Sequence, residues 1–301
     1  MKSFLIAILL ALPLAAGAQA HGVSGVEVLK LTQQYVNVAP KRYVGSPGHA
    51  AAESFIKSHF APEVAKGNFV DDAFTARTPV GMLNMHNLLV KFPGKKDGII
   101  VLATHYETNY WLKDINFIGA NDGACTTALL IELGAYYRAH PPQGYSIWLL
   151  FTDGEESINK EWTETDSLYG TRHIAAKWSG DGTIGHIKAF VLADMIGWKQ
   201  LNIDKETNST PWLLELEAKA GRETGHSKYL FRDSQAIEDD HLPFVQRGVP
   251  SLDVIDFEYG TAADPEAYHH TEQDTMDKLS VASLQVAADL FLEIVKLIDA
   301  R

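Results

Sequence analysis

The sequence predicts an α/β fold with three layers, in which a mixed, mostly parallel sheet lies between helices on both faces. Three observations favour it. Short apolar runs bounded by turn residues recur along the chain, as expected for strands buried on both faces. Segments with helical spacing lie between these runs, and such alternation is typical of a mostly parallel sheet. The segment 281–299 carries a continuous apolar stripe, made of Leu284, Ala287, Leu290, Phe291, Ile294 and Leu297.

The individual elements follow from these patterns in chain order. Five β-branched or leucine-rich runs are the expected strands, at 86–92, 98–103, 146–151, 187–193 and 249–255. Five segments of helical periodicity are the expected helices, at 50–60, 124–138, 167–178, 211–224 and 281–299. Segment 61–82 is expected to add an antiparallel pair. Because the chain shows no internal repeat or linker-like tract, residues 21–301 are expected to form one domain.

The first twenty residues are expected to be a cleavable signal peptide. Lys2 supplies a positive start, residues 4–16 are almost entirely apolar, and Ala18-Gln19-Ala20 is a small-residue cleavage signal. The apolar run is shorter than the roughly 20 residues that a membrane-spanning helix needs. We therefore expect a secreted or periplasmic protein that has no membrane contact after cleavage near Ala20.

Composition narrows the classes of function. The 301-residue chain is 46% apolar and 21% charged, which is typical of a globular protein. Its 26 Lys and Arg residues face 38 Asp and Glu, a net charge of −12, whereas a nucleic-acid partner requires a basic face. The single cysteine, Cys125, excludes a disulfide framework and a Cys-rich zinc site.

Residues that can bind metals or move protons follow four of the expected strands. In open α/β sheets, ligands bind outside the carboxyl ends of the strands, so these side chains should meet at one edge. A glycine-flanked turn just before an expected helix adds one more carboxylate. In chain order the residues are His105 and Glu107, Asp122 in the turn 119–123, Glu155 and Glu156, Asp194, and His269 and His270.

Asp122, Glu156 and His270 form a mixed oxygen and nitrogen set that suits zinc. Catalytic zinc sites commonly use three protein ligands and leave the fourth position for water or substrate. Asp122 could instead cap the following helix, and His270 alone could be an ordinary surface or core histidine. The adjacent Glu155 and Glu156 favour a metal site more strongly. Two neighbouring carboxylates repel each other unless a cation binds one of them or a proton neutralises one of them.

These motifs, in this order, resemble those of the M28 zinc-aminopeptidase superfamily. The resemblance covers roughly residues 42–297, and two further stretches, at 162–173 and 237–244, resemble its glutaminyl cyclase branch. It implies a zinc-exopeptidase-like fold. The stretches that carry the resemblance to the superfamily are His105-Tyr106-Glu107, Gly119-Ala120-Asn121-Asp122-Gly123, Asp153-Gly154-Glu155-Glu156, Asp194 and His270-Thr271-Glu272-Gln273-Asp274-Thr275.

The resemblance also implies roles for individual residues. Asp122, Glu156 and His270 match the ligands of the single catalytic zinc of the cyclases. Glu155 matches their general acid and base, Asp194 and Asp239 match carboxylates in its hydrogen-bond network, and Trp162 matches an aromatic wall of the substrate pocket. In two-metal aminopeptidases, His105 and Asp194 would hold a second zinc, with Asp122 bridging.

Several positions depart from the pattern of the cyclases. Glu107 stands where the superfamily usually has Asp, and Trp162 lies one residue further from Glu155 and Glu156 than in the animal enzymes. His269 occupies the position of a pocket tryptophan, and Asp253 replaces a histidine near the site. The loop 256–268 is longer than in the animal enzymes.

The expected function is that of a zinc-dependent glutaminyl-peptide cyclotransferase, which acts on peptides or proteins with N-terminal glutamine. It would convert that glutamine to pyroglutamate and release ammonia, using one zinc ion per chain. The alternative is an M28-type aminopeptidase with two zinc ions. A third possibility, a binding domain that has lost catalysis, is disfavoured because Glu155 and all three expected zinc ligands are present.

Overall fold

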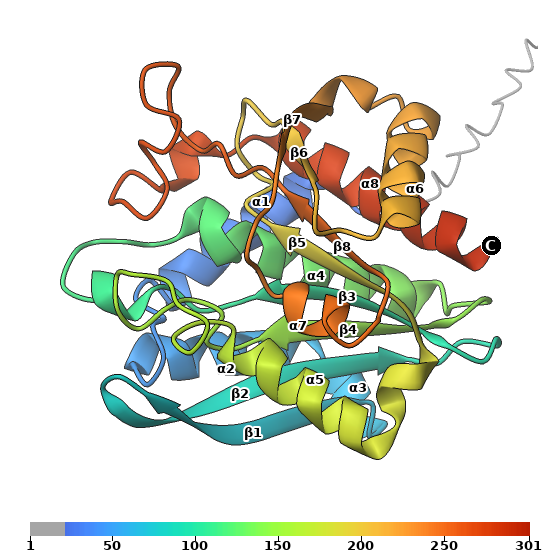
Figure 1. Cartoon of the computed structure of the whole chain (residues 1–301), viewed down its shortest axis with the longest axis horizontal. Coiled ribbons are helices and arrows are strands. Elements are labelled where there is room, and N and C mark those ends of the chain that lie inside the picture. Colours follow the sequence, from blue (N-terminus) through green and yellow to red (C-terminus); the bar gives the residue numbers. More distant parts are fainter. Residues whose placement is uncertain (1–21) are drawn as a thin grey trace, which may run out of the picture.

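A six-stranded sheet runs through the middle of the molecule (Figure 1). The computed structural model describes residues 22–301, so the expected signal peptide, residues 1–20, lies outside the described residues. The strands follow one another across the sheet in the order β1-β2-β4-β3-β5-β8. Their bounds are β1 Phe69–Thr78, β2 Gly81–Phe92, β3 Ile99–His105, β4 Ser146–Thr152, β5 Ile187–Asp194 and β8 Ser251–Ile255.

The sheet is mixed but mostly parallel, as the sequence predicts. β3 pairs in parallel with both β4 and β5, and β5 pairs in parallel with β8. β2 pairs antiparallel with both β1 and β4. Only β2 therefore runs against the other five strands, and the carboxyl ends of β3, β4, β5 and β8 lie along one edge.

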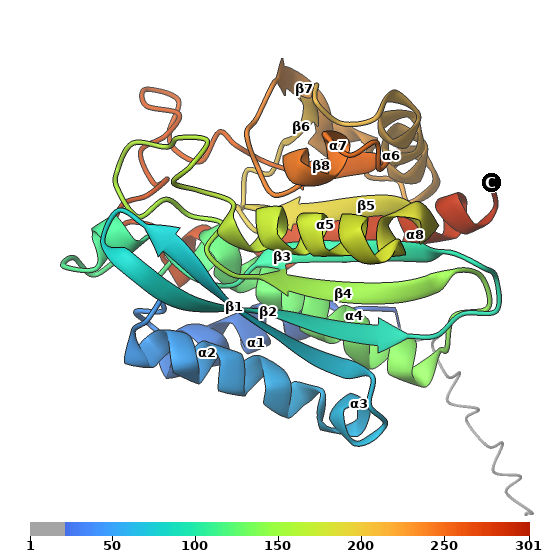
Figure 2. The same cartoon turned by 60° about the horizontal axis from the view of Figure 1, so that its bottom comes forward.

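Helices cover both faces of this sheet, which confirms the three-layer prediction. α5 and α7 pack on one face, and Figure 2 shows α5 lying across it. α1, α2, α4, α6 and α8 contribute to the larger core on the other face. The helices are α1 Gly25–Val38, α2 Pro47–His59, α3 Ala61–Ala65, α4 Cys125–Ala139, α5 Tyr169–Asp181, α6 Pro211–Glu223, α7 Leu242–Val245 and α8 Val281–Asp299.

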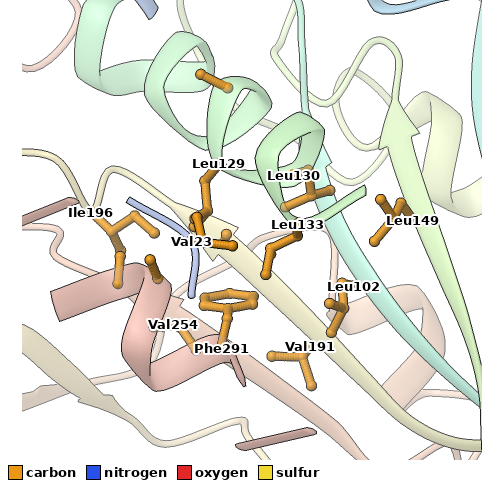
Figure 3. Close-up of a cluster of buried hydrophobic side chains, with 14 of the residues drawn as sticks. Val23, Leu102, Leu129, Leu130, Leu133, Leu149, Val191, Ile196, Val254 and Phe291 are labelled. Atoms are coloured by element: carbon orange, nitrogen blue, oxygen red, sulfur yellow. The ribbon is translucent and has the colours of Figure 1, made fainter. Parts of the chain in front are cut away.

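The apolar run of β3 shows why the sheet needs helices on both sides. All seven of its residues are buried. Because successive strand residues point to opposite faces, Leu102 joins the core beneath α4 and α8, whereas Val101 joins the core beneath α5. In the larger core, Phe291 of α8 lies among Leu133 of α4 and Val191 of β5 (Figure 3).

Three segments differ from the prediction. Segment 61–82 holds the short helix α3 and the strand β1, which pairs with the already predicted β2, so it contributes one full strand and not two. Pro62 favours this helix because proline is well tolerated in the first helical turn. The prediction also lacked α1, and it lacked a separate two-stranded sheet formed by β6 (Ile203–Glu206) and β7 (Leu230–Gln235).

The described chain, residues 22–301, contains no helix that is both long enough and apolar enough to cross a membrane.

The core of α8 gives a direct test of the packing. Phe291 is fully buried, and replacing a buried phenylalanine with alanine typically costs about 3–5 kcal/mol. We expect Phe291→Ala to lower the free energy of unfolding by an amount in this range, measured by denaturant titration. Val26→Ala, at a site that is 55% exposed on α1, is the control and should change it by less than about 0.5 kcal/mol. Equal effects of the two changes would contradict this packing.

Candidate active site

The predicted site residues meet at the carboxyl edge of the sheet. His105 is the last residue of β3 and Asp194 is the last residue of β5. Glu155 and Glu156 lie in the turn after β4. In the sheet, β4 lies between β2 and β3. All of these residues are buried, and the most exposed of them, Asp194, is 9% exposed. The residues that the sequence singles out therefore lie together at the ends of strands that it predicts.

Asp122 reaches this edge from an irregular turn that precedes α4. Gly119 and Gly123 both have positive φ (51° and 82°), and a Cβ on Gly123 would lie 2.9 Å from the His105 ring. The Asp274 carboxylate accepts hydrogen bonds from the backbone N–H groups of Asn121 (2.8 Å) and Asp122 (3.1 Å). Because the Asp122 carboxylate faces two imidazoles and makes no capping bond to α4, the helix-cap alternative does not describe it.

A buried arginine, Arg42, holds the turn that carries Asp122 through its carbonyl oxygens. The Arg42 guanidinium is inaccessible to solvent and donates to the carbonyl oxygens of Ile118 (2.6 Å), Gly119 (2.7 Å) and Asp122 (3.0 Å). It also donates to the carbonyl oxygen of Tyr106, just after β3. Its fixed fork of donors suits several acceptors at once, so Arg42 ties the Asp122 turn to the end of β3.

His270 lies close to both of the other expected zinc ligands, Asp122 and Glu156. His270 Nε2 is 3.3 Å from Asp122 Oδ2 and 3.1 Å from Glu156 Oε1. Ligands about 2.0–2.1 Å from a tetrahedral zinc ion are separated from one another by about 3.3 Å. His270 has a positive φ of 53°, a conformation that is uncommon outside glycine and that concentrates at functional sites. The donor set and its spacing therefore fit zinc.

A second set of candidates lies beside the first. His105 Nε2 is 3.1 Å from Asp122 Oδ1 and 3.4 Å from Asp194 Oδ1. Both nitrogens of His105, together with Asp122 Oδ2 and Asp194 Oδ1, are buried without a hydrogen-bond partner. These short distances between His105 and the two carboxylates, without hydrogen bonds, are suited to side chains that bind one cation together. The predicted second-metal residues are thus also brought together.

Glu155 lies among several other acidic groups. Burial, and then the Glu156 carboxylate, raise the pKa of Glu155 well above its usual value. Burial and the neighbouring Asp194 raise the pKa of Asp239 well above its usual value. Burial also raises the pKa of Asp194. Groups with raised pKa values can hold a proton near neutral pH, which is what a general acid requires.

The loop that carries Asp239 is tied to the strand edge by its neighbour. Asp240 accepts hydrogen bonds from the hydroxyl groups of Thr152, at the end of β4, and Thr171, in α5. The backbone N–H of Asp240 also donates to Asp239 Oδ1. These bonds fix the position of Asp239 relative to the turn that carries Glu155.

A pocket of about 320 Å³ is lined by seven acidic and imidazole side chains, which are Asp122, Glu155, Glu156, Asp194, Asp239, His269 and His270. The half-buried Trp162 and His269, which the sequence predicts as substrate contacts, both line it. The His269 ring lies against the His270 ring, with centroids 3.9 Å apart. Phe257 of the loop 256–268 lines the pocket too, so this loop forms part of the wall. A pocket of this size that joins apolar walls to a few polar groups is suited to a small ligand.

Sequence reasoning missed Asn109, which contacts two expected metal ligands. Its side chain is 1% exposed, and its Nδ2 donates to Glu156 Oε2 and lies 3.2 Å from His270 Nε2. The one feature of the sequence that could have indicated Asn109 as a site residue is its position, four residues after His105. Asp253, a departure noted above, is fully buried in β8 with its Oδ2 3.5 Å from His241 Nδ1. It lies next to a histidine and not at the metal candidates.

Comparison with known proteins agrees with the fold. The model of peptidase family M28 matches residues 87–295. A glutaminyl-peptide cyclotransferase of Drosophila melanogaster is 30% identical over 255 residues, which cover 75% of this chain and 70% of that protein.

Two solved structures are similar along nearly the whole chain. The crystal structure of a glutaminyl cyclase from an Acidobacteriales bacterium has a TM-score of 0.92 and 63% identity, and the match covers 97% of this chain and 100% of that one. A Zn-dependent exopeptidase from Parabacteroides distasonis shares the fold at 20% identity, with a TM-score of 0.80 over 94% of this chain and 100% of that one. The chain belongs to peptidase family M28 and, within it, to the glutaminyl cyclase branch.

Proposed function

We propose that this chain is a zinc-dependent glutaminyl-peptide cyclotransferase, which converts the N-terminal glutamine of peptides or proteins to pyroglutamate and releases ammonia. One observation carries the proposal. Glu155, a buried carboxyl with a raised pKa, lies beside an Asp, Glu and His set in one pocket, in a chain that is 63% identical to a bacterial glutaminyl cyclase.

The reaction requires a neutral amine and a protonated leaving group. The α-amine of the substrate attacks its own side-chain carboxamide carbon, a carbon–nitrogen bond forms to the amine, and the bond to the departing nitrogen breaks. Glu155 would accept a proton from the α-amine and pass it to the departing nitrogen, which leaves as ammonia. Such proton transfer contributes roughly 10²–10⁴-fold to rate. Because the substrate supplies its own nucleophile, no water molecule is consumed.

The neighbouring carboxyls would keep Glu155 ready for this exchange. Asp239 and Asp240 both raise the pKa of Glu155, after burial and Glu156, because clustered carboxylates cannot all ionise in a site shielded from water. Asp194 would act in the same network. Trp162 and His269 would contact the glutaminyl side chain from the pocket wall.

Asp122, Glu156 and His270 would hold a single zinc ion, which would act as a Lewis acid on the carboxamide oxygen. Their separations of 3.1 and 3.3 Å across His270 Nε2 support this assignment. Asn109, which donates to Glu156 Oε2, would orient that carboxylate, as hydrogen-bonding partners of metal ligands commonly do.

The expected signal peptide, residues 1–20, would place the enzyme outside the cytoplasm, in the periplasm or in the medium. Peptides and proteins that expose N-terminal glutamine in that compartment would be its substrates.

The aminopeptidase alternative depends on His105 and Asp194 holding a second zinc ion with Asp122. The short distances from His105 Nε2 to Asp122 and Asp194 are the observation that favours it. The two functions make different products from different peptides, so product analysis separates them.

Purified enzyme should release ammonia from peptides with N-terminal glutamine and should free no leucine from peptides with N-terminal leucine. A coupled ammonia assay and amino-acid analysis measure the two products. A peptide with N-terminal asparagine, whose shorter side chain cannot close the same five-membered ring, is the matched substrate control. Release of leucine without ammonia from the glutamine peptide would reverse the assignment in favour of the aminopeptidase.

Glu155→Gln removes the group that moves the proton while keeping its size. We expect kcat for ammonia release to fall by at least about 100-fold, while zinc content measured by atomic absorption stays at one ion per chain. Glu164→Gln, at an exposed position nine residues later, should leave kcat unchanged. Full turnover by the Glu155→Gln enzyme would rule out the proton-transfer role.

Zinc should stabilise the folded chain because its ligands come together only in that state. Free zinc at about 100 times its dissociation constant should add ~2.7 kcal/mol of stability, which chelator dialysis would remove as a drop in Tm. In Asp122→Asn the response of Tm to zinc should be lost or shifted to much higher zinc concentration. Asp114→Asn, at an exposed site, should respond like the wild type. An equal response of Asp122→Asn would contradict the ligand assignment.

A further inference from the structure

A second group of buried charges lies just outside the pocket, between α2 and the end of β4. His49, in the first turn of α2, has its Nε2 2.8 Å from Asp153 Oδ1 and its Nδ1 3.3 Å from Glu53 Oε1. The His49 side chain is 5% exposed and that of Asp153 is fully buried. The two carboxylates face opposite nitrogens of the ring, so the three side chains form a chain of two ion pairs.

Both carboxylate oxygens of Asp153 and its backbone N–H have partners in the structure. Its Oδ2 accepts a hydrogen bond from the backbone N–H of His86 (2.7 Å), and its own N–H donates to Asn87 Oδ1 (3.1 Å). Its Oδ1 is the atom that faces His49. The only charged side chain that the structure pairs with Asp153, among the described residues, is therefore His49.

His49 is placed for this contact by the start of its own helix. Its backbone N–H donates to Ser46 Oγ (2.9 Å), the N-cap of α2, and its ring stacks on the Tyr106 ring at 5.5 Å between centroids. Although burial lowers it, Asp153 and Glu53 raise the pKa of His49 to about 9. The ring is thus an imidazolium at neutral pH and balances the buried Asp153 carboxylate.

A short path leads from Asp153 to Glu155. Gly154, between them, has a φ of 65°, and a Cβ there would lie 2.8 Å from the Met85 sulfur. The carbonyl oxygens of Gly154 and Glu155 accept hydrogen bonds from Tyr169 (2.7 Å) and Leu168 (2.8 Å). Asp153 directly precedes this two-residue turn, so its position sets where the turn begins.

We propose that His49 is a positioning residue: by pairing with Asp153 it fixes the Asp153-Gly154-Glu155 turn and so aims the Glu155 carboxyl into the pocket. This inference rests on the proposed role of Glu155. Removing the imidazolium leaves Asp153 as a buried, unpaired charge, which is strongly unfavourable, and the turn relaxes toward whatever position solvates that carboxylate. Pocket residues that do not belong to this turn, such as Trp162, are unaffected.

His49→Asn is the test, because asparagine keeps a polar side chain and removes the charge. We expect kcat for ammonia release to fall about 10-fold or more, with KM within about threefold of the wild type and zinc content unchanged. His59→Asn, in the last turn of the same helix and outside this cluster, is the matched control and should change neither constant. A His49→Asn enzyme with unchanged kcat, or with a raised KM alone, overturns the proposal.

A double variant keeps the test valid if His49→Asn folds poorly. Asp153→Asn removes the charge that His49 balances, so adding His49→Asn to it should lower kcat by no more than about twofold further. An additional 10-fold loss in the double variant would show that His49 acts on something other than Asp153, and would overturn the proposal.

The pH dependence of stability reports on the pair independently of activity. The groups that face His49 are Asp153, Glu53, Glu107 and the neutral Tyr106 hydroxyl. Because the folded pKa of His49 is about 9 and the ordinary value is about 6.5, its contribution is complete below pH 6.5 and is lost as the pH rises through 9. The Tm advantage of the wild type over His49→Asn should shrink over that window. A constant difference contradicts an ionised pair.

These measurements also separate failure of the inference from failure of the proposed function. If the wild type releases no ammonia from glutamine peptides, the function is wrong, yet the pH-dependent Tm difference and a crystal structure of His49→Asn still test whether the Glu155 turn moves. A Glu155 side chain in the wild-type position in that structure overturns the positioning role.

Discussion

Charge balance among buried carboxyls is the constraint on which the site depends. Asp122, Glu155, Glu156, Asp194 and Asp239 all lie in one region with little contact to water. Such a group stays compact only if some members hold protons and a cation balances others. The raised pKa values of Glu155 and Asp239 allow these two carboxyls to hold protons. The imidazoles of His105 and His270, which hold the pKa of Asp122 well below its usual value despite its burial, mark where the positive charge belongs.

The backbone around the site is fixed by groups that take no part in the proposed chemistry. Arg42 and Asp274 bind opposite sides of the turn that carries Asp122, one through carbonyl oxygens and the other through N–H groups. Tyr259 donates in turn to Asp274. His49 and Asp153 hold the turn of Glu155 in a comparable way. Buried polar groups of this kind are expensive unless every partner is present, so each clamp restricts its turn to one geometry, and the restriction is what preorganises the site.

Much of the fold and of the candidate site could be predicted from the sequence, and the elements that the prediction lacked have physical reasons. Buried strands such as 98–103 stand out because both faces are apolar, and the edge they share follows from their parallel direction. α1 shows helical spacing at Val28, Leu31 and Tyr35 but begins directly after the expected signal peptide, where the prediction stopped. β6 is only four residues long and polar, so it leaves no periodic signal. Asn109 reaches the site from an irregular loop, where spacing carries no information about direction.

The same arrangement of side chains can serve cyclisation or hydrolysis, and the substrate decides how much of it is used. Hydrolysis needs a water molecule held and deprotonated beside the carbonyl carbon, a task that a second metal ion held by His105 and Asp194 would serve in the aminopeptidase alternative. In cyclisation the substrate carries its own nucleophile, four bonds from the carbon that it attacks, so proximity would replace that second set of ligands. His105 and Asp194 would then be free to act on protons: His105 Nε2 lies 3.1 Å from Asp122 and 3.4 Å from Asp194, and His105 lowers the pKa of Glu155, which burial and Glu156 raise.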